Sequence, residues 1–201
     1  PVDNAVTLNG SPLVIAREES ATGYFAQKLA LAPGKNVITV RPNGQTPSYG
    51  SIVAVGRQPL ESVAAKAGRD IKVTRRMLVL RDGKWVETSD MRLGERVQVQ
   101  LTLEVKRDMK YVSIVDERAA TLEPVDQLPG YDWNGGLAFY RESGNTATRF
   151  FIGFLNAGSY RLSYDATAQV AGSFMGGICT VQSQYAPELT AHSAAHRITV
   201  K

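Results

Sequence analysis

Residues 97–105 alternate strictly between apolar and polar side chains, reading Val97-Gln98-Val99-Gln100-Leu101-Thr102-Leu103-Glu104-Val105. Successive side chains of an extended chain point to opposite faces, so this segment predicts a strand with one buried and one solvated face. Similar short segments recur between Gly, Pro, Asn and Asp turns, and no segment sustains a helical period. The chain therefore predicts an all-β fold, an antiparallel β-sandwich of the immunoglobulin or fibronectin type.

Two turn signals divide neighbouring strand candidates. Asp82-Gly83 separates residues 78–80 from residues 85–87, and Asp-Gly readily supplies the positive φ angles of a tight hairpin. Asn156-Ala157-Gly158 separates residues 150–155 from residues 160–166 in the same way. The first pair is expected to form an antiparallel hairpin, and a turn is expected between the strands of the second.

The first third of the chain has a different organisation. Short strand pairs are expected within residues 6–13 and 26–40, and a helical turn within residues 59–66, before a boundary near Gly68. About 65 residues are few for an independent core. We therefore expect a partial β domain at 1–67, completed by chain preceding Pro1, and a sandwich domain at 68–201. Pro1 is not a translation start, so we also expect the chain to be a piece of a longer protein.

The charge, hydropathy and cysteine content of the chain argue against several classes of function. The net charge is +4 and the basic residues are scattered, which argues against nucleic acid as a partner. No apolar stretch approaches the length of a membrane-spanning helix. The one cysteine, Cys179, lies in an apolar run and is expected to be a buried thiol.

No constellation of residues predicts catalysis or a cofactor. His192 and His196 lack the companion ligands of a zinc site, so no metal is expected. Asp116-Glu117 and Glu123 neighbour turns and are expected to be solvated loop charges. Because acid, base and nucleophile do not converge in any motif, we expect a protein that is not an enzyme.

Several aromatic residues lie close to turns. Tyr131 and Trp133 precede Asn134-Gly135-Gly136, Phe139 follows it, and Tyr185 precedes Ala186-Pro187. Core packing is the simplest interpretation. Loop aromatics beside glycines also serve as contact anchors, because they bury much area at little entropic cost.

A series of segments, in order along residues 71–201, resembles the C-terminal macroglobulin domain of bacterial α2-macroglobulins. The matching segments are residues 73–79, 93–99, 107–112, 122–125, 139–142, 155–164, 185–188 and 197–200. Residues 31–36 and 47–51 resemble the return segment of the CUB-like domain in the same family. The resemblance implies a macroglobulin-type β-sandwich preceded by a partial CUB-like segment.

The resemblance also implies a function, that of a protease trap in the bacterial periplasm or cell envelope. In such proteins a protease cuts a bait region and a Cys-Gln thioester then acylates the attacker. This chain lacks the thioester motif, since Cys179 is followed by Thr180-Val181-Gln182. The implied partners are the thioester domain and other domains of the same protein, which can be lipid-anchored, and through it the target proteases.

The resemblance further implies a shielding role for one pair of residues in this chain. A Met-Tyr pair preceding a Pro-Glu covers the thioester in the family, and the matching residues here are Gln184 and Tyr185. Gln184 departs from the apolar partner of that pair. The alternative function is a stand-alone extracytoplasmic adhesive or ligand-binding sandwich, with Tyr131 and Trp133 as its contact residues.

Overall fold

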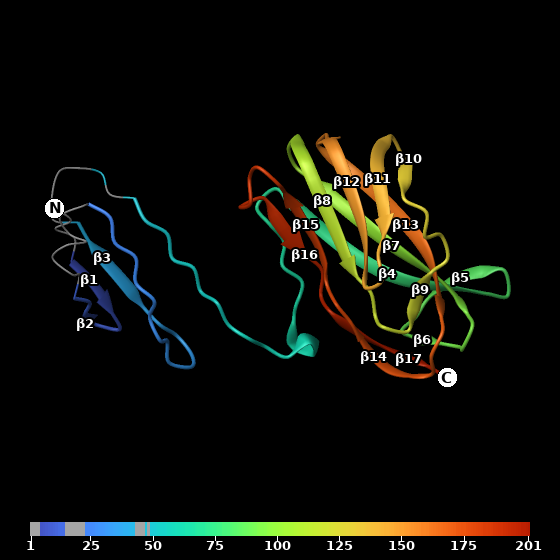
Figure 1. The fold of residues 1–201 in the computed structure, drawn as a ribbon, viewed down its shortest axis with the longest axis horizontal. Helices are drawn as coiled ribbons and strands as arrows, with labels where there is room; N and C mark the ends of the chain where they lie inside the picture. Colours follow the sequence, from blue (N-terminus) through green and yellow to red (C-terminus); the bar gives the residue numbers. More distant parts are fainter. Residues whose placement is uncertain (1–4, 15–22, 43–46, 48) are drawn as a thin grey trace. The chain divides into compact units, whose positions relative to one another are not determined.

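A computed structural model describes residues 5–14, 23–42, 47 and 49–201. The chain divides into two compact units, Pro1–Gly56 and Arg57–Lys201 (Figure 1). Both units are built from β-strands, and the regular helical structure among the described residues is one 3₁₀ turn, η1 (Leu60–Ser62). The prediction of an all-β, largely antiparallel fold is confirmed.

The first unit contains one small sheet. Its strands are β1 (Ala5–Leu8), β2 (Ser11–Pro12) and β3 (Ile38–Arg41), in the order β2-β1-β3. Val6 is the one buried apolar residue among those that the structure describes in this unit. The sheet thus encloses little core of its own, in line with a partial domain. Its assignment as a CUB-like segment ending at residue 67 stays a prediction.

The second unit is a sandwich of two large sheets with a smaller third sheet (Figure 1). The six-stranded sheet has the order β10 (Gly130–Asn134), β11 (Leu137–Ser143), β12 (Ala147–Leu155), β8 (Met109–Glu117), β15 (Cys179–Ser183) and β16 (Thr190–His192). The five-stranded sheet has the order β5 (Lys84–Glu87), β4 (Ile71–Arg81), β7 (Arg96–Val105), β13 (Gly158–Ala168) and β9 (Leu122–Pro124). The third sheet joins β14 (Gly172–Gly176), β17 (His196–Val200) and β6 (Asp90–Met91).

The alternating segment at 97–105 forms β7, in the middle of the five-stranded sheet. Its apolar positions are all buried, and its polar positions lie on the outer face. The main apolar core lies between the two large sheets and includes Leu101, Phe150 and Leu162. The hairpin predicted at 78–87 is confirmed, because β4 and β5 pair across left-handed φ angles of 50° at Asp82 and 72° at Gly83. The turn predicted between residues 150–155 and 160–166 joins two sheets, because β12 pairs with β8 in one sheet and β13 pairs with β7 in the other.

Residues just before β4 lie against the sandwich within the second unit. Lys66 and His192 exchange two backbone hydrogen bonds, and the Ala195 N–H donates to the Val63 carbonyl. Gly68 is required here, since an ideal Cβ would stand 2.3 Å from the Thr190 carbonyl oxygen. The compact unit therefore begins before the boundary expected at Gly68, and the domain assignment of 68–201 stays a prediction.

A layer of polar side chains divides the interior into two apolar clusters. On β4 the inward row reads Ile71, Val73, Arg75, Met77, Val79, so Arg75 separates the main cluster from a second one. Its Nη1 donates to Asp116 Oδ1 at 2.7 Å, and each of the two side chains is 1% exposed. The Tyr164 hydroxyl donates to Asp116 Oδ2 at 2.5 Å.

This layer corrects the expectation that Asp116 is a solvated loop charge. Asp116 follows Val112 and Ile114 at two-residue intervals on β8, and this spacing directs its carboxylate into the core. Burial raises the pKa of Asp116, while Arg75, Tyr164 and Arg118 act in the opposite direction. The carboxylate is thus held in the interior by its partners.

Candidate functional site

The outer face of the six-stranded sheet carries a row of aromatic side chains. The register places Tyr131 beside Tyr140, and Tyr140 beside Phe151, on three neighbouring strands. The rings of Tyr131 and Tyr140 meet edge to face, with centroids 5.1 Å apart and planes at 68°. A groove of about 280 Å³ runs along this row and is lined by Tyr111, Val112, Tyr131, Tyr140, Phe151, Ile152, Gly153 and Gln184. The sheet therefore presents a continuous aromatic surface to its surroundings.

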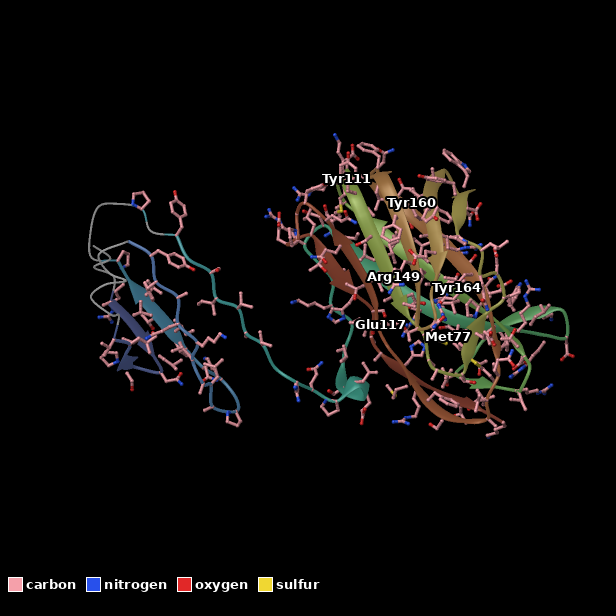
Figure 2. All side chains as sticks on the ribbon, viewed as in Figure 1. Met77, Tyr111, Glu117, Arg149, Tyr160 and Tyr164 are labelled. Atoms are coloured by element: carbon pink, nitrogen blue, oxygen red, sulfur yellow. The ribbon has the colours of Figure 1, made fainter. Side chains whose placement is uncertain are left out.

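Tyr185 extends this surface from the loop between β15 and β16. Its side chain is 79% exposed, and its ring meets Tyr111 edge to face with centroids 5.1 Å apart. The loop is closed at its base, where the Ser183 N–H donates to the Leu189 carbonyl and the Leu189 N–H donates to the Ala186 carbonyl. Figure 2 shows Tyr111 at the upper end of the sandwich. A tyrosine ring is thus presented outward on a short, hydrogen-bonded loop.

Tyr111 has a backbone conformation that is unusual for an aromatic residue. Its φ angle is 51°, in the left-handed region, where a residue with a Cβ loses about 1–2 kcal/mol relative to the right-handed region. The pairing of β8 with β12 joins Val112 to Ile152 and Lys110 to Phe154, and omits Tyr111 and Gly153. The Tyr111 carbonyl accepts the Gln184 N–H at 2.9 Å, which extends the pairing of β8 with β15 on its other side. Sequence reasoning missed this residue, because nothing in a Tyr-Val-Ser-Ile strand signals a positive φ.

The structure brings most of the candidate contact residues together. Gln184 and Tyr131 line the same groove, and Tyr185 adjoins it through Tyr111. Trp133 lies two residues beyond Tyr131 on β10, which places it on the same face, and it is 69% exposed. Core packing holds for Phe139, whereas Tyr131, Trp133 and Tyr185 are largely exposed. Exposed aromatics gathered in this way have the character of a contact surface.

A second cavity, of about 330 Å³, lies between β4 and the segment joining β16 to β17. Its lining comprises Ala65, Ala67, Lys72, Val73, Thr74, Arg75, His192, Ser193, Ala194 and His196. His192 Nδ1 lies 3.0 Å from the Ser193 carbonyl oxygen. Across residues 5–14, 23–42, 47 and 49–201, no three His, Cys, Asp or Glu side chains form a group suited to a metal ion.

Replacing His196 with glutamine is expected to flatten the pH dependence of stability in acid. Burial, and then the Arg75 guanidinium, lower the pKa of His196 below its ordinary 6.5 in the folded state. The unfolded chain therefore takes up the proton first as the pH falls. The stability due to neutral His196 is present above about pH 6.5 and declines as the pH falls toward the folded-state pKa. Urea midpoints at a series of pH values from about 7.5 to about 5 measure the slope, and a variant with the wild-type slope would refute the assignment.

Cys179 lies in the core beside the polar layer. It is fully buried, as predicted, and its N–H donates to Ser193 Oγ at 2.9 Å. Burial, and secondly the Asp116 carboxylate, raise the pKa of the thiol well above its ordinary value. The thiol is therefore held protonated and out of reach of other molecules.

Within the described ranges no helix is long and apolar enough to cross a bilayer.

Comparison with known proteins places this architecture in a family. Residues 71–188, more than half of the chain, match the model of the bacterial alpha-2-macroglobulin MG10 domain. A search of curated proteins gives no significant match.

Solved structures of bacterial alpha-2-macroglobulins share the fold. Salmonella alpha-2-macroglobulin reacted with methylamine is 23% identical, with a TM-score of 0.57 over 70% of this chain and 10% of that chain. Escherichia coli alpha-2-macroglobulin activated by porcine elastase is 21% identical, with a TM-score of 0.58 over 70% of this chain and 14% of that chain. The native conformation of the E. coli protein is 17% identical, with a TM-score of 0.54 over 83% of this chain and 12% of that chain. The chain thus spans little more than a tenth of these relatives, and through its macroglobulin domain it belongs to the bacterial alpha-2-macroglobulin family.

Proposed function

We propose that this chain is a non-catalytic C-terminal part of a bacterial alpha-2-macroglobulin-like protease inhibitor, in which it packs against and shields a thioester domain. The observation that carries the proposal is the presentation of Tyr185, 79% exposed at the end of an aromatic surface. A tyrosine ring this exposed buries its apolar area only when another protein surface packs against it. The rest of the same protein supplies that surface.

The chemistry of a thioester explains why an aromatic cover is useful. A thioester is an activated acyl group that water hydrolyses, so it survives only in a site from which water is excluded. The Tyr185 ring supplies apolar area for this purpose, and its hydroxyl keeps a hydrogen bond to polar neighbours. Gln184, which lines the adjoining groove, brings an amide where the family has an apolar side chain. The shield proposed here is accordingly more polar than the family pattern.

The relatives support a role in protease trapping. One of them is described as reacted with methylamine and another as activated by porcine elastase. We assign the same class of activity, with the periplasm or cell envelope as its location, to the protein of which this chain is a part. The immediate partners are the thioester domain and other domains of that protein, and the ultimate partners are proteases cleaving its bait region.

The first unit fits the same proposal as a CUB-like return segment. The match to the native E. coli structure covers 83% of the chain, whereas residues 57–201 make up less than three quarters of it. The likeness therefore extends into residues before Arg57. With little apolar core of its own, the small sheet suits a segment completed by other strands.

Replacing Tyr185 with glycine in the full-length protein is expected to shorten the lifetime of the thioester by about tenfold or more, as for loss of a central aromatic contact. Thiol titration and intact mass, before and after methylamine, report the fraction of thioester that survives over time. Trp85→Gly is the control, because Trp85 is 44% exposed on β5 in the other large sheet. A Tyr185→Gly lifetime equal to that of wild type would contradict the shielding role.

The exposure of Tyr131 and Trp133 favours a second candidate, a stand-alone adhesive or ligand-binding sandwich. Both side chains stand on the outer face of β10, which is the edge of its sheet. Saturable binding on a glycan or peptide array, lost on Trp133→Ala and retained by Tyr185→Gly, would select this function over the first.

A further inference from the structure

The loop that presents Tyr185 is tied to one short stretch of β8. The Gln184 N–H donates to the Tyr111 carbonyl at 2.9 Å, and Ser183 Oγ donates to the Lys110 carbonyl at 3.2 Å. The Tyr111 ring meets the Tyr185 ring at 81°, edge to face. Backbone and side chain of the loop are therefore both held by residues 110 and 111.

The left-handed conformation of Tyr111 occurs where these contacts are made. Met109 and Val112 are both buried, although a regular strand would place residues three apart on opposite faces. The left-handed φ at Tyr111 coincides with this shift in which positions face the core. The two residues between Met109 and Val112, Lys110 and Tyr111, are both exposed. Opposite lies Gly153, where an added Cβ would meet no atom within 4 Å. Tyr111 thus lies outside the ladder with β12, while its carbonyl continues the pairing with β15 into the loop.

We infer that Tyr111 is a positioning residue, whose strained backbone and ring hold Tyr185 in a fixed orientation for contact with the partner domain. This inference rests on the function proposed above. Such strain persists where the surrounding structure maintains it, and it often accompanies functional sites. A loop fixed before contact loses less conformational entropy when the interface forms, so the shield closes more tightly.

The Tyr131–Tyr140 pair provides a matched control on the same face. Its ring centroids are also 5.1 Å apart, and Tyr131 is even more exposed than Tyr185. Neither tyrosine of this pair bonds the loop at 184–188. Removing the Tyr131 ring therefore costs a similar aromatic contact without releasing Tyr185.

Three variants of this chain separate positioning from general stability. Tyr111→Gly removes the ring and accommodates the positive φ without strain, so the strand is expected to remain folded. Tyr111→Phe keeps the ring, and Tyr131→Ala is the control. NMR relaxation of selectively labelled tyrosine rings, with Tyr185 assigned through Tyr185→Phe, reports how rigidly the Tyr185 ring is held. Loss of the Tyr111 ring alters the Tyr185 chemical shift whatever the orientation of Tyr185, so the order parameter is the readout. Tyr111→Gly keeps the backbone bonds of the loop but is expected to lower the order parameter of the Tyr185 ring, whereas Tyr111→Phe and Tyr131→Ala leave it unchanged. An unchanged Tyr185 order parameter in Tyr111→Gly would overturn the inference.

The second arm measures thioester lifetime in the full-length protein. Tyr111→Gly is expected to shorten the thioester lifetime by about 2- to 10-fold. This range corresponds to the free energy that one edge-to-face aromatic pair contributes. Adding Tyr111→Gly to Tyr185→Gly is expected to shorten it no further, because the two residues act through one ring. Full additivity of the two changes would also overturn the inference.

The two arms distinguish failure of this inference from failure of the proposed function. If Tyr185→Gly shortens the lifetime and Tyr111→Gly does not, Tyr185 shields without positioning by Tyr111 and the inference is wrong. If neither variant changes the lifetime, the shielding function fails, and the positioning role in contact with a thioester domain fails with it. The order parameter of the Tyr185 ring would still establish whether Tyr111 holds Tyr185 in place.

Discussion

Replacing Asp116 with alanine is expected to lower the free energy of unfolding of the second unit by about 3–5 kcal/mol. The variant leaves the Arg75 guanidinium, 1% exposed, without the carboxylate that balances its charge. It also removes the acceptor of the buried Tyr164 hydroxyl. A lone buried charge is among the most destabilising defects a domain can carry. Urea denaturation followed by tryptophan fluorescence measures the loss.

Glu123→Ala is the matched control for Asp116→Ala. Glu123 lies seven residues further along the chain, and its side chain is exposed on β9. Its removal is expected to change stability by no more than about 0.5 kcal/mol. Equal effects of the two substitutions would show that the polar layer does not contribute to stability.

Replacing the three side chains of the polar layer with apolar ones is a second test of how the layer contributes to stability. Burial raises the pKa of Asp116 against the opposing effect of Arg75, so the ion pair bears a large desolvation cost. The triple variant Arg75→Met, Asp116→Leu and Tyr164→Phe removes the charges and the hydroxyl together. It is expected to recover most of the stability lost in Asp116→Ala. Stability as low as that of the single variant would mean that Arg75 has a further structural role, through its bonds to the Gly177 and Ala194 carbonyls.

Replacing Phe150 with alanine is expected to destabilise the second unit by about 3–5 kcal/mol. Phe150 is fully buried at the centre of β12, and its ring lies 5.5 Å from that of Phe139 and 6.3 Å from that of Tyr164. Truncation removes contacts to both large sheets at once and leaves a cavity between them.

Phe154→Ala on the same strand is the control for this change. Phe154 is 50% exposed, so much less area returns to water when it is truncated, and its loss is expected to be well below that of Phe150. Differential scanning calorimetry gives both values. A Phe150→Ala variant as stable as Phe154→Ala would place the core elsewhere than between the two large sheets.

Local patterns predicted the strands well. The two-residue alternation of β7 identified a buried face directly, because burial and the period of an extended chain act on the same residues. Asp82-Gly83 predicted its hairpin for an equally local reason, the positive φ angles that both residues adopt. The strands at 150–155 and 160–166 were also predicted, but not that they enter different sheets.

What sequence reasoning missed depends on contacts between distant residues. Asp116 continues the inward spacing of Val112 and Ile114, yet a carboxylate is expected in solvent until Arg75 and Tyr164 are known to face it. The parallel pairing of β17 with β6 joins residues more than one hundred positions apart.

The candidate site illustrates the same difference. Aromatic residues are suited both to cores and to contact surfaces, so the exposure of Tyr131, Trp133 and Tyr185 could not be assigned from residue type. The left-handed Tyr111 has no local signal at all, since its conformation is maintained by the loop and by the phase change between Met109 and Val112.

The proposed function requires that the rest of the protein covers Tyr185 and that protease cleavage exposes it. Oxidative footprinting with mass spectrometry measures how fast the Tyr185 side chain is modified, with Trp85 as an internal reference. We predict fast modification in this 201-residue chain, where Tyr185 is 79% exposed, slow modification in the intact full-length protein, and fast modification again after protease cleavage. The same rate in all three samples would contradict the account.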